Sequence, residues 1–516
     1  MYLTQTLHRA LQQAPEHPMT VCGDRTRTTR EVVDRVARLA GALRGLGVGE
    51  GDRVGMLSLN SDRYHEFLFA SWWVGAVPHP INTRWSAAEI SYALEDSGTQ
   101  VLFVDDAFAA IVPEFPGMGA VVYCGDGPAP NGMLGYDEMI GTSTPVEDLR
   151  RGDDAVAALL YTGGTTGFPK GVTLTHRGML TAAMGALNVS RAYEAGGCTL
   201  VAAPMFHVAA LAGCTAQSLV GGTQVFVPRF DAGEVLRLID RHRIISLPLV
   251  STMIQMLCEH PDATTTDVSS VRTISYGAAP MPEAVLTQAM RTFPQSGFNQ
   301  AYGMTEAPMI TVLTREDHAA GGAPLRSAGR AAPHAEVRIV NPSGQVAQRG
   351  AVGEIVTRGD FVMAGYWNKP GETATALRDG WLHTGDLGYM DEEGYIYIVD
   401  RIKDMIITGG ENVYSSEVEN ALASHPAIEG CAVIGLPDQQ WGERVHALIV
   451  LRRATTATAE EIRSHAKSLI AGYKAPRSVD FVDALPLTAA GKIAKHELRQ
   501  RYTATAPDSD PASASL

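Results

Sequence analysis

The sequence has few cysteines, and their spacing does not suggest a metal or redox site. The six are scattered, and no two form a C-x-x-C pair of the kind that binds zinc or carries redox chemistry. The N-terminal residues MYLTQTLHRALQQAPEH also lack the apolar core of a secretory signal peptide. A large chain with sparse cysteines favours a reducing compartment, so we expect a cytoplasmic protein.

Positive charge is scarce as well. Lys and Arg number 42 against 56 Asp and Glu, which gives a formal net charge of −14 at pH 7. A general nucleic-acid-binding protein needs a net basic surface, so we expect no nucleic-acid partner. A small polyanion can still bind where a few cations and backbone N–H groups converge.

One stretch is long and uncharged enough to resemble a membrane span. Residues 195–228 contain no Asp, Glu, Lys or Arg, which is more than the roughly 20 residues that a span needs. Pro204, Pro228 and several glycines interrupt it. We therefore predict two buried strands flanking a buried helix, and no integral membrane segment.

The remaining composition is that of a globular protein. Of 516 residues, 45% are hydrophobic and 19% charged, which excludes a disordered or coiled-coil class for the bulk of the chain. The length suggests three or four domain-sized units, or one large domain with a smaller one.

The first half alternates short apolar runs with helical patterns. Capping boxes at Thr28-x-x-Glu31 and Ser86-x-x-Glu89 predict two helix starts. The apolar runs 53–59 and 101–104 predict buried strands. This βαβα order predicts an α/β fold with stacked, mostly parallel sheets covered by helices.

The pattern changes near residue 335. Runs 336–340, 353–357 and 394–399 read as strands bounded by Gly, Pro and Asn, which predicts a β-rich subdomain over about 335–399. A charged break follows at 400–404. We therefore predict a large domain over 1–399, a small α+β domain over 405–503, and a disordered, polar tail over 504–516.

The strongest local signal is a loop rich in glycine and threonine. An apolar strand at 159–161 leads into TGGTTGFPKG at 162–171. Glycines allow the backbone to approach an anion and present its N–H groups, and Lys170 adds positive charge. It is not a Walker A loop, because Gly171 follows Lys170 where that motif needs Ser or Thr. A simple turn with a solvated lysine is the alternative interpretation.

The segment YTGGTTGFPKGVTLTH, at 161–176, resembles the phosphate-loop signature of the adenylate-forming superfamily. That superfamily contains acyl-CoA synthetases, peptide-synthetase adenylation domains and firefly-type luciferases. Further segments are similar to its other motifs and occur in the same order. They are YGAAP at 276–280, NQAYGMTE at 299–306, WLHTGDLG at 381–388, DRIKD at 400–404, GGENVY at 409–414 and PLTAAGKI at 486–493.

The resemblance implies a nucleotide site. Tyr302 would stack near adenine, Thr305 would contact the α-phosphate, and Glu306 would hold Mg²⁺, a cation that binds through one or two carboxylates plus phosphate oxygens. Asp386 and Arg401 would contact the ribose. The implied ATP- or AMP-binding residues are Thr162, Gly163, Gly164, Thr165, Thr166, Lys170, Gly277, Ala278, Ala279, Gln300, Ala301, Tyr302, Gly303, Met304, Thr305, Asp386, Arg401 and Lys492.

The resemblance also implies catalytic, hinge and substrate-channel residues. Lys403 would be the hinge about which a mobile C-terminal domain rotates. The implied catalytic residues are Lys492, Glu306, Thr166 and His207, and the implied CoA channel is Gly409, Gly410, Glu411 and Asn412. The implied acyl pocket is Phe206, His207, Val250, Met253, Gly277, Ala278, Ala301, Met309 and Ile310.

The implied reaction converts a carboxylic acid, ATP with Mg²⁺, and CoA into acyl-CoA, AMP and pyrophosphate through an acyl-adenylate. CoA is favoured as the acceptor because no carrier or condensation domain is appended. We expect a medium- or long-chain fatty acid, with a coumarate- or ferulate-type aryl-propenoate as the alternative. A ligase that loads a carrier protein, a luciferase-like oxidase and a binding protein with a decayed site stay open. So does the oligomeric state, a homodimer included.

Overall fold

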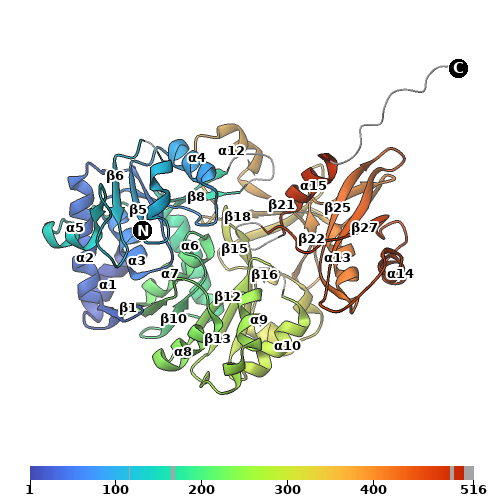
Figure 1. Cartoon of the computed structure of the whole chain (residues 1–516), viewed down its shortest axis with the longest axis horizontal. Helices are drawn as coiled ribbons and strands as arrows, with labels where there is room; N and C mark the ends of the chain where they lie inside the picture. Colours follow the sequence, from blue (N-terminus) through green and yellow to red (C-terminus); the bar gives the residue numbers. More distant parts are fainter. Residues whose placement is uncertain (116, 164–168, 280, 488–492, 505–516) are drawn as a thin grey trace. The chain divides into compact units, whose positions relative to one another are not determined.

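The computed structural model describes residues 1–115, 117–163, 169–279, 281–487 and 493–504 (Figure 1). Four of the predicted site residues, Gly164, Thr165, Thr166 and Lys492, lie outside this part of the chain, as does nearly all of the predicted tail. The chain divides into two compact units. The first comprises Met1–Arg338, Val356–Thr384 and Asp391–Tyr397, and the second comprises Ile339–Ile355, Gly385–Met390 and the chain from Ile398 onward. The domain limits expected from the sequence stay a prediction.

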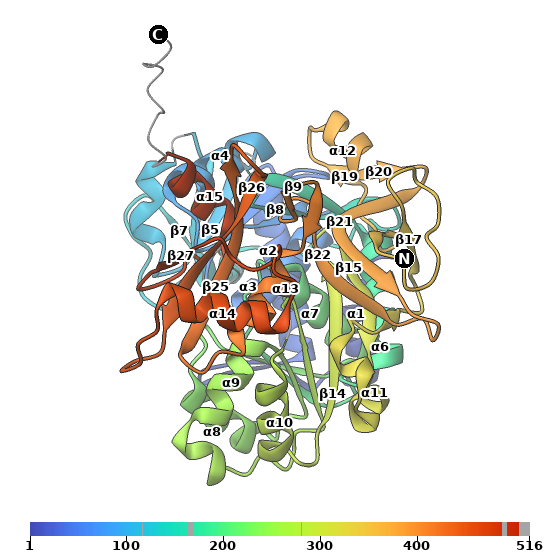
Figure 2. The same ribbon diagram turned by 90° about the vertical axis from the view of Figure 1, so that its right-hand side faces the viewer.

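The largest sheet of the first unit has nine strands in the order β16-β15-β14-β13-β12-β10-β11-β1-β2. Its central neighbours, from β14 to β1, are parallel, and the edge pairs are antiparallel. The strands are Arg330–Ala331, Ala307–Leu313, Gly297–Met304, Thr273–Gly277, Ser246–Val250, Cys198–Val201, Thr223–Phe226, Pro18–Cys22 and Arg25–Thr28, in sheet order. The helices α8 (Ala232–His242), α9 (Ser251–Glu259) and α10 (Glu283–Thr292) pack side by side along it (Figures 1 and 2).

A second sheet is parallel throughout, in the order β4-β3-β5-β6-β7. Its strands are Val77–Pro80, Arg53–Leu57, Val101–Val104, Ala120–Tyr123 and Leu134–Gly135. The predicted strand 53–59 ends two residues early, because the Leu59 N–H bonds the Asp105 carboxylate at 2.8 Å instead of a strand. Both predicted capping boxes form, at the starts of α2 (Thr29–Gly45) and α4 (Ala87–Ser97).

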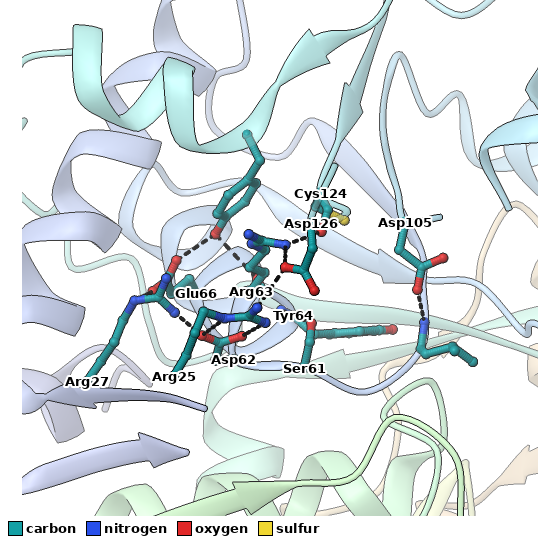
Figure 3. A network of polar contacts seen from close by, with 12 residues as sticks. Arg25, Arg27, Ser61, Asp62, Arg63, Tyr64, Glu66, Asp105, Cys124 and Asp126 are labelled. Atoms are coloured by element: carbon teal, nitrogen blue, oxygen red, sulfur yellow. Dashed lines mark hydrogen bonds and ion pairs between the residues drawn. The ribbon is translucent and has the colours of Figure 1, made fainter. Parts of the chain in front are cut away.

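The helix α3 (Asp62–Trp73) is buried along its whole length, charged residues included. Successive odd positions of a strand share a face, so Arg25 and Arg27 of β2 both reach Asp62, as Figure 3 shows. Arg63 donates to the Asp126 carboxylate at 2.9 Å. The pairs that Asp62 forms with Arg25 and Arg27 allow its charge to be buried between β2 and α3.

The uncharged stretch 195–228 folds as predicted, into β10, the helix α7 (Val208–Val220) and β11. Among the described residues, no helix is both long and apolar enough to cross a bilayer. The other helices of the first unit are α1 (Gln5–Gln13), α5 (Tyr136–Thr142), α6 (His176–Ser190), α11 (Arg315–Ala320) and α12 (Pro370–Ala376).

A three-stranded sheet, in the order β19-β9-β8, carries the glycine-rich loop. It consists of Gly365–Tyr366, Lys170–Thr175 and Val156–Thr162. The β-rich segment beyond residue 335 contains β17 (Glu336–Val340), β18 (Gly353–Arg358), β20 (Leu377–Arg378), β21 (Trp381–Met390) and β22 (Ile396–Arg401). The boundary between the two units passes through these strands.

The C-terminal part of the second unit is a five-stranded sheet covered by helices. Its order is β24-β23-β26-β25, and β27 pairs with β26. The strands are β23 (Ile406–Thr408), β24 (Glu411–Val413), β25 (Ile428–Asp438), β26 (Gly442–Leu451) and β27 (Ser478–Phe481). The helices are α13 (Ser415–Ala423), α14 (Ala459–Leu469) and α15 (Lys495–Ala504), and α13 and α14 lie next to each other (Figure 2). This part of the chain therefore has the mixed α and β composition that was predicted for it.

Candidate active site

The glycine-rich loop connects two antiparallel strands. Thr162, the last residue of β8, is the register partner of Lys170, the first residue of β9. The hairpin therefore holds the threonine and the lysine side by side at the base of the loop. Tyr161 anchors β8 through a 2.6 Å hydrogen bond from its hydroxyl to the Asp96 carboxylate.

Three of the predicted acyl-pocket residues lie side by side toward one edge of the nine-stranded sheet, where the parallel pairing of β12, β13 and β14 ends. Val250, Gly277 and Ala301 are register partners across β12, β13 and β14. The carboxyl ends of parallel strands are where α/β proteins bind ligands. Phe206 and His207 follow β10, a parallel neighbour of β12, and their rings lie 4.7 Å apart. His207 is also the N-cap residue of α7.

Two residues at this edge have backbone strain. Ala278 and Met309 adopt left-handed φ angles of 66° and 59°, a conformation that costs of order 1–3 kcal/mol for non-glycine residues and concentrates at functional sites. The chain is also closely packed here. A side chain on Gly277 would come within 2.4 Å of the Ala301 carbonyl, and one on Gly303 within 2.5 Å of the Met309 nitrogen.

Glu306 lies in the turn between β14 and β15 and is only 7% exposed. The Tyr366 hydroxyl donates a 2.8 Å hydrogen bond to its Oε1. Burial, reinforced by the charge of Glu306, raises the pKa of Tyr366, so the phenol stays protonated and keeps donating. The backbone of Glu306 is fixed as well, because its carbonyl accepts from the Met363 N–H at 2.8 Å.

Tyr366 also connects Glu306 to the lysine of the loop. The Lys170 ammonium lies 5.3 Å from the centre of the Tyr366 ring, within the range of a cation–π contact. The same ammonium forms an ion pair with Glu372 of α12. Neither Tyr366 nor Glu372 was predicted from the sequence. They come from GYWNKPGET at 365–373, whose spacing has no chemical signal of its own.

In the second unit, the structure brings the two predicted ribose contacts together. Asp386 of β21 is 7% exposed, and its Oδ1 lies 3.2 Å from Nε of Arg401, at the end of β22. Arg401 itself is exposed, and Lys403 follows in the next turn. A carboxylate held by a guanidinium is a suitable acceptor for the two hydroxyls of a ribose.

The predicted CoA-channel segment forms a tight hairpin. Gly409 and Gly410 link β23 to β24 with φ angles of 62° and 83°, the pattern of a type I′ turn, which needs positive φ at both positions. A side chain on Gly409 would meet the Trp441 ring at 2.9 Å. Glu411 and Asn412 are exposed beside this turn.

The residues that flank the segment carrying Lys492 pair with each other. Leu487 and Ile493 form an antiparallel bridge, and the Ala494 N–H donates to the Pro486 carbonyl at 2.8 Å. No cluster of three or more potential metal-ligating side chains occurs in the described parts of the chain.

This arrangement is that of an adenylate-forming enzyme, and comparison with known proteins agrees. The chain belongs to the AMP-binding enzyme family, because that family's model matches residues 7–367. The model of the AMP-binding enzyme C-terminal domain matches residues 417–492. The resemblance inferred from the sequence motifs is therefore confirmed.

Particular relatives cover nearly the whole chain. A feruloyl-CoA synthase of Amycolatopsis sp is 40% identical over 96% of this chain and 98% of its own. The fatty acid–[acyl-carrier-protein] ligase ScoC of Streptomyces coeruleorubidus is 35% identical, over 97% and 96%. The medium/long-chain-fatty-acid–CoA ligase FadD8 of Mycobacterium tuberculosis is 36% identical, over 96% and 89%.

A solved structure confirms the predicted fold. The o-succinylbenzoate CoA synthetase MenE of Bacillus subtilis, in complex with the acyl-adenylate intermediate OSB-AMP, matches with a TM-score of 0.84 and 32% identity. The match covers 96% of this chain and 97% of MenE.

Proposed function

We propose that the chain is an AMP-forming acyl-CoA synthetase, an acid–thiol ligase that uses ATP and CoA. The observation that carries the proposal is the chain of contacts from buried Glu306 through Tyr366 to Lys170. Glu306 lies in the turn that follows β14, the strand that carries Ala301 and pairs with β13, and this supports a nucleotide site near the predicted acyl pocket. A carboxylate and an ammonium are the groups needed to bind a triphosphate next to a carboxylic acid.

In the first half-reaction, the carboxylate of the acid attacks the α-phosphorus of ATP, and pyrophosphate leaves. Both reactants are anions, so the residues must orient them and offset their repulsion. We assign this role to Lys170 and Lys492. Glu306 suits Mg²⁺, which binds one or two carboxylates together with phosphate oxygens and would neutralise part of the triphosphate charge.

In the second half-reaction, the thiolate of CoA attacks the acyl carbonyl, the acyl–phosphate bond breaks, and AMP leaves. We assign the channel for the thiol to the Gly409–Asn412 hairpin. Asp386 and Arg401 would hold the ribose. His207 would separate the acid pocket from the thiol path, which its position beside Phe206 supports.

We propose a medium- or long-chain fatty acid as the substrate, because the pocket candidates are apolar and because ScoC and FadD8 are fatty-acid ligases by name. The second candidate is an aryl-propenoate. It is supported by the feruloyl-CoA synthase, whose identity to this chain, at 40%, exceeds that of the two fatty-acid ligases.

Mass spectrometry of one mixture tests both parts of the proposal. The purified protein is incubated with Mg-ATP, CoA and a pool of fatty, cinnamic and benzoic acids. We expect AMP and a single dominant acyl-CoA, whose mass identifies the acid. Accumulation of acyl-adenylate without acyl-CoA would contradict CoA as the acceptor and favour a carrier protein, the acceptor in the name of ScoC.

We also propose a cytoplasmic location, which the six free cysteines support, since thiols stay reduced there. Size-exclusion chromatography with light scattering on the same preparation would test for a homodimer.

A further inference from the structure

The ion pair between Lys170 and Glu372 has no part in the reaction described above. Lys170 begins β9, beside the glycine-rich loop, and Glu372 lies in the first turn of α12. The oxygen of Glu372 that faces the ammonium is buried and has no hydrogen-bond partner in the described part of the chain. The charge of this oxygen is therefore balanced by Lys170.

The backbone holds the two partners in place. β19 pairs with β9, so Tyr366 lies opposite Val172. The Trp367 N–H donates to the Gly171 carbonyl at 2.7 Å, and the Tyr366 N–H donates to the Thr373 hydroxyl at 2.9 Å. The helix that carries Glu372 is thus fixed to the strand that carries Lys170, and the carboxylate cannot move far from the ammonium.

The pair is nevertheless open to exchange. The side chains of Lys170 and Glu372 are 32% and 42% exposed, so a ligand that approaches from solvent can reach the ammonium. A triphosphate approaching the loop carries several negative charges and can take over the ammonium. The negative charge of Glu372 would also repel it.

We propose that Glu372 pairs with the Lys170 ammonium when no nucleotide triphosphate is bound. It competes with the triphosphate for this ammonium, so that the Glu372 carboxylate lowers the affinity of the site for ATP. The inference rests on the proposed function, since it assigns Lys170 to the ATP phosphates. Tyr366 keeps the ammonium in place while its anionic partner changes, because a cation–π contact does not depend on which anion is bound.

Isothermal titration calorimetry of MgATP and AMP, without acid or CoA, tests this competition. In Glu372→Gln the competing charge is gone, and we expect the Kd for MgATP to fall about twofold to fivefold. The Kd for AMP should stay unchanged, because AMP lacks the β- and γ-phosphates. Glu316→Gln removes an exposed ion pair with Arg191 elsewhere in the first unit and is the matched control, with no change expected.

A double-mutant cycle shows whether the effect passes through Lys170. In the Lys170→Gln background, the additional Glu372→Gln change should give no tighter MgATP binding. Unchanged or weaker binding by Glu372→Gln alone, or a gain that persists without Lys170, overturns the inference. A wild-type protein that binds MgATP but forms no acyl-CoA contradicts the proposed function alone, whereas one that does not bind MgATP contradicts both.

Discussion

At the scale of single residues, the proposed nucleotide site depends most directly on Tyr366. Its hydroxyl holds the Glu306 carboxylate at 2.8 Å. In Tyr366→Phe that hydrogen bond is lost, and bonds to charged groups contribute about 1.5–3 kcal/mol. We expect the Mg²⁺ concentration for half-maximal activity to rise by about tenfold. A Mg²⁺ titration of the ATP-dependent rate measures it.

Tyr395→Phe is the matched control, because it removes a similar 2.6 Å bond from a tyrosine hydroxyl to Asp317, elsewhere in the first unit. An unchanged Mg²⁺ requirement in Tyr366→Phe, or an equal change in both variants, would remove Tyr366 from the support of Glu306.

Of the residues in these contacts, the sequence predicted Glu306 and Lys170 but not Tyr366 and Glu372. Glu306 and Lys170 lie in motifs with a chemical signature, so the pattern of residues identified them. Tyr366 and Glu372 act only because β19 pairs with β9 and places residues from distant parts of the chain together. A contact of that kind depends on tertiary pairing, and a single sequence carries no local trace of it.

At the scale of elements, helix starts and buried strands could be predicted where the sequence carries a local signal. The capping boxes at Thr28 and Ser86 form because the signal lies within four residues. Strand ends were less predictable, since a side chain distant in sequence can decide them, as Asp105 does for β3. Charged residues in a fully buried helix, such as Asp62 and Glu66 of α3, follow only from the arginines that meet them.

That buried pairing gives a prediction for stability. Asp62, with a side chain 1% exposed, pairs with Arg25 and Arg27. Removing one partner of a buried ion pair typically costs 3–5 kcal/mol, because it leaves an uncompensated charge. We expect Asp62→Asn to destabilise the first unit by about 3 kcal/mol, since Asp126 and Glu66 still face the two arginines. Scanning calorimetry measures the loss.

Glu16→Gln is the control for Asp62→Asn. It removes an ion pair with Arg30 whose side chains are 70% and 61% exposed, and such pairs contribute about 0–1 kcal/mol. Equal losses in the two variants would contradict the assigned role of the buried pair.

The first residue of α15 forms polar contacts that give a second prediction for stability. This residue, Lys495, donates to the Ser415 hydroxyl and pairs with Glu419, both at 2.7 Å. Burial raises the pKa of Glu419, and the Lys495 ammonium offsets part of that rise. In Lys495→Met the carboxyl pKa should rise further. Because the folded form then binds a proton more readily than the unfolded form, the variant loses stability as the pH rises.

The loss of folding stability in Lys495→Met relative to wild type should therefore be large at about pH 8. It should shrink at about pH 5.5, where the Glu419 carboxyl is closer to protonation. Thermal unfolding at both pH values measures it. Lys467→Met, at an exposed position of α14, should show no such dependence. A deficit that grows as the pH falls would contradict the pairing.

At the scale of the whole molecule, the predicted site residues are divided between the two units. Lys170 and Glu306 belong to the first, and Asp386, Arg401 and the Gly409–Asn412 hairpin belong to the second. A two-step reaction suits such a division, because each step can use a different subset of groups from the second unit. The expected rotation about Lys403 stays a prediction.

Lys492 offers the sharpest test of that division. The first half-reaction builds negative charge on the α-phosphate, where a positioned ammonium contributes about 10²–10³ in rate. The second half-reaction starts from a mixed anhydride that already has a good leaving group, so it needs no such help. Lys492→Ala should therefore lose acyl-adenylate formation by about 10²–10³ and still convert supplied acyl-adenylate and CoA to acyl-CoA at close to the wild-type rate.

Single-turnover assays of the two half-reactions, run separately, make this comparison. Lys467→Ala is the control for a general loss of charge on the second unit, and both of its half-reactions should match wild type. If Lys492→Ala slows both half-reactions equally, the lysine acts throughout the cycle. A single arrangement of the catalytic groups would then have to serve both steps, and this would contradict the rotation expected about Lys403.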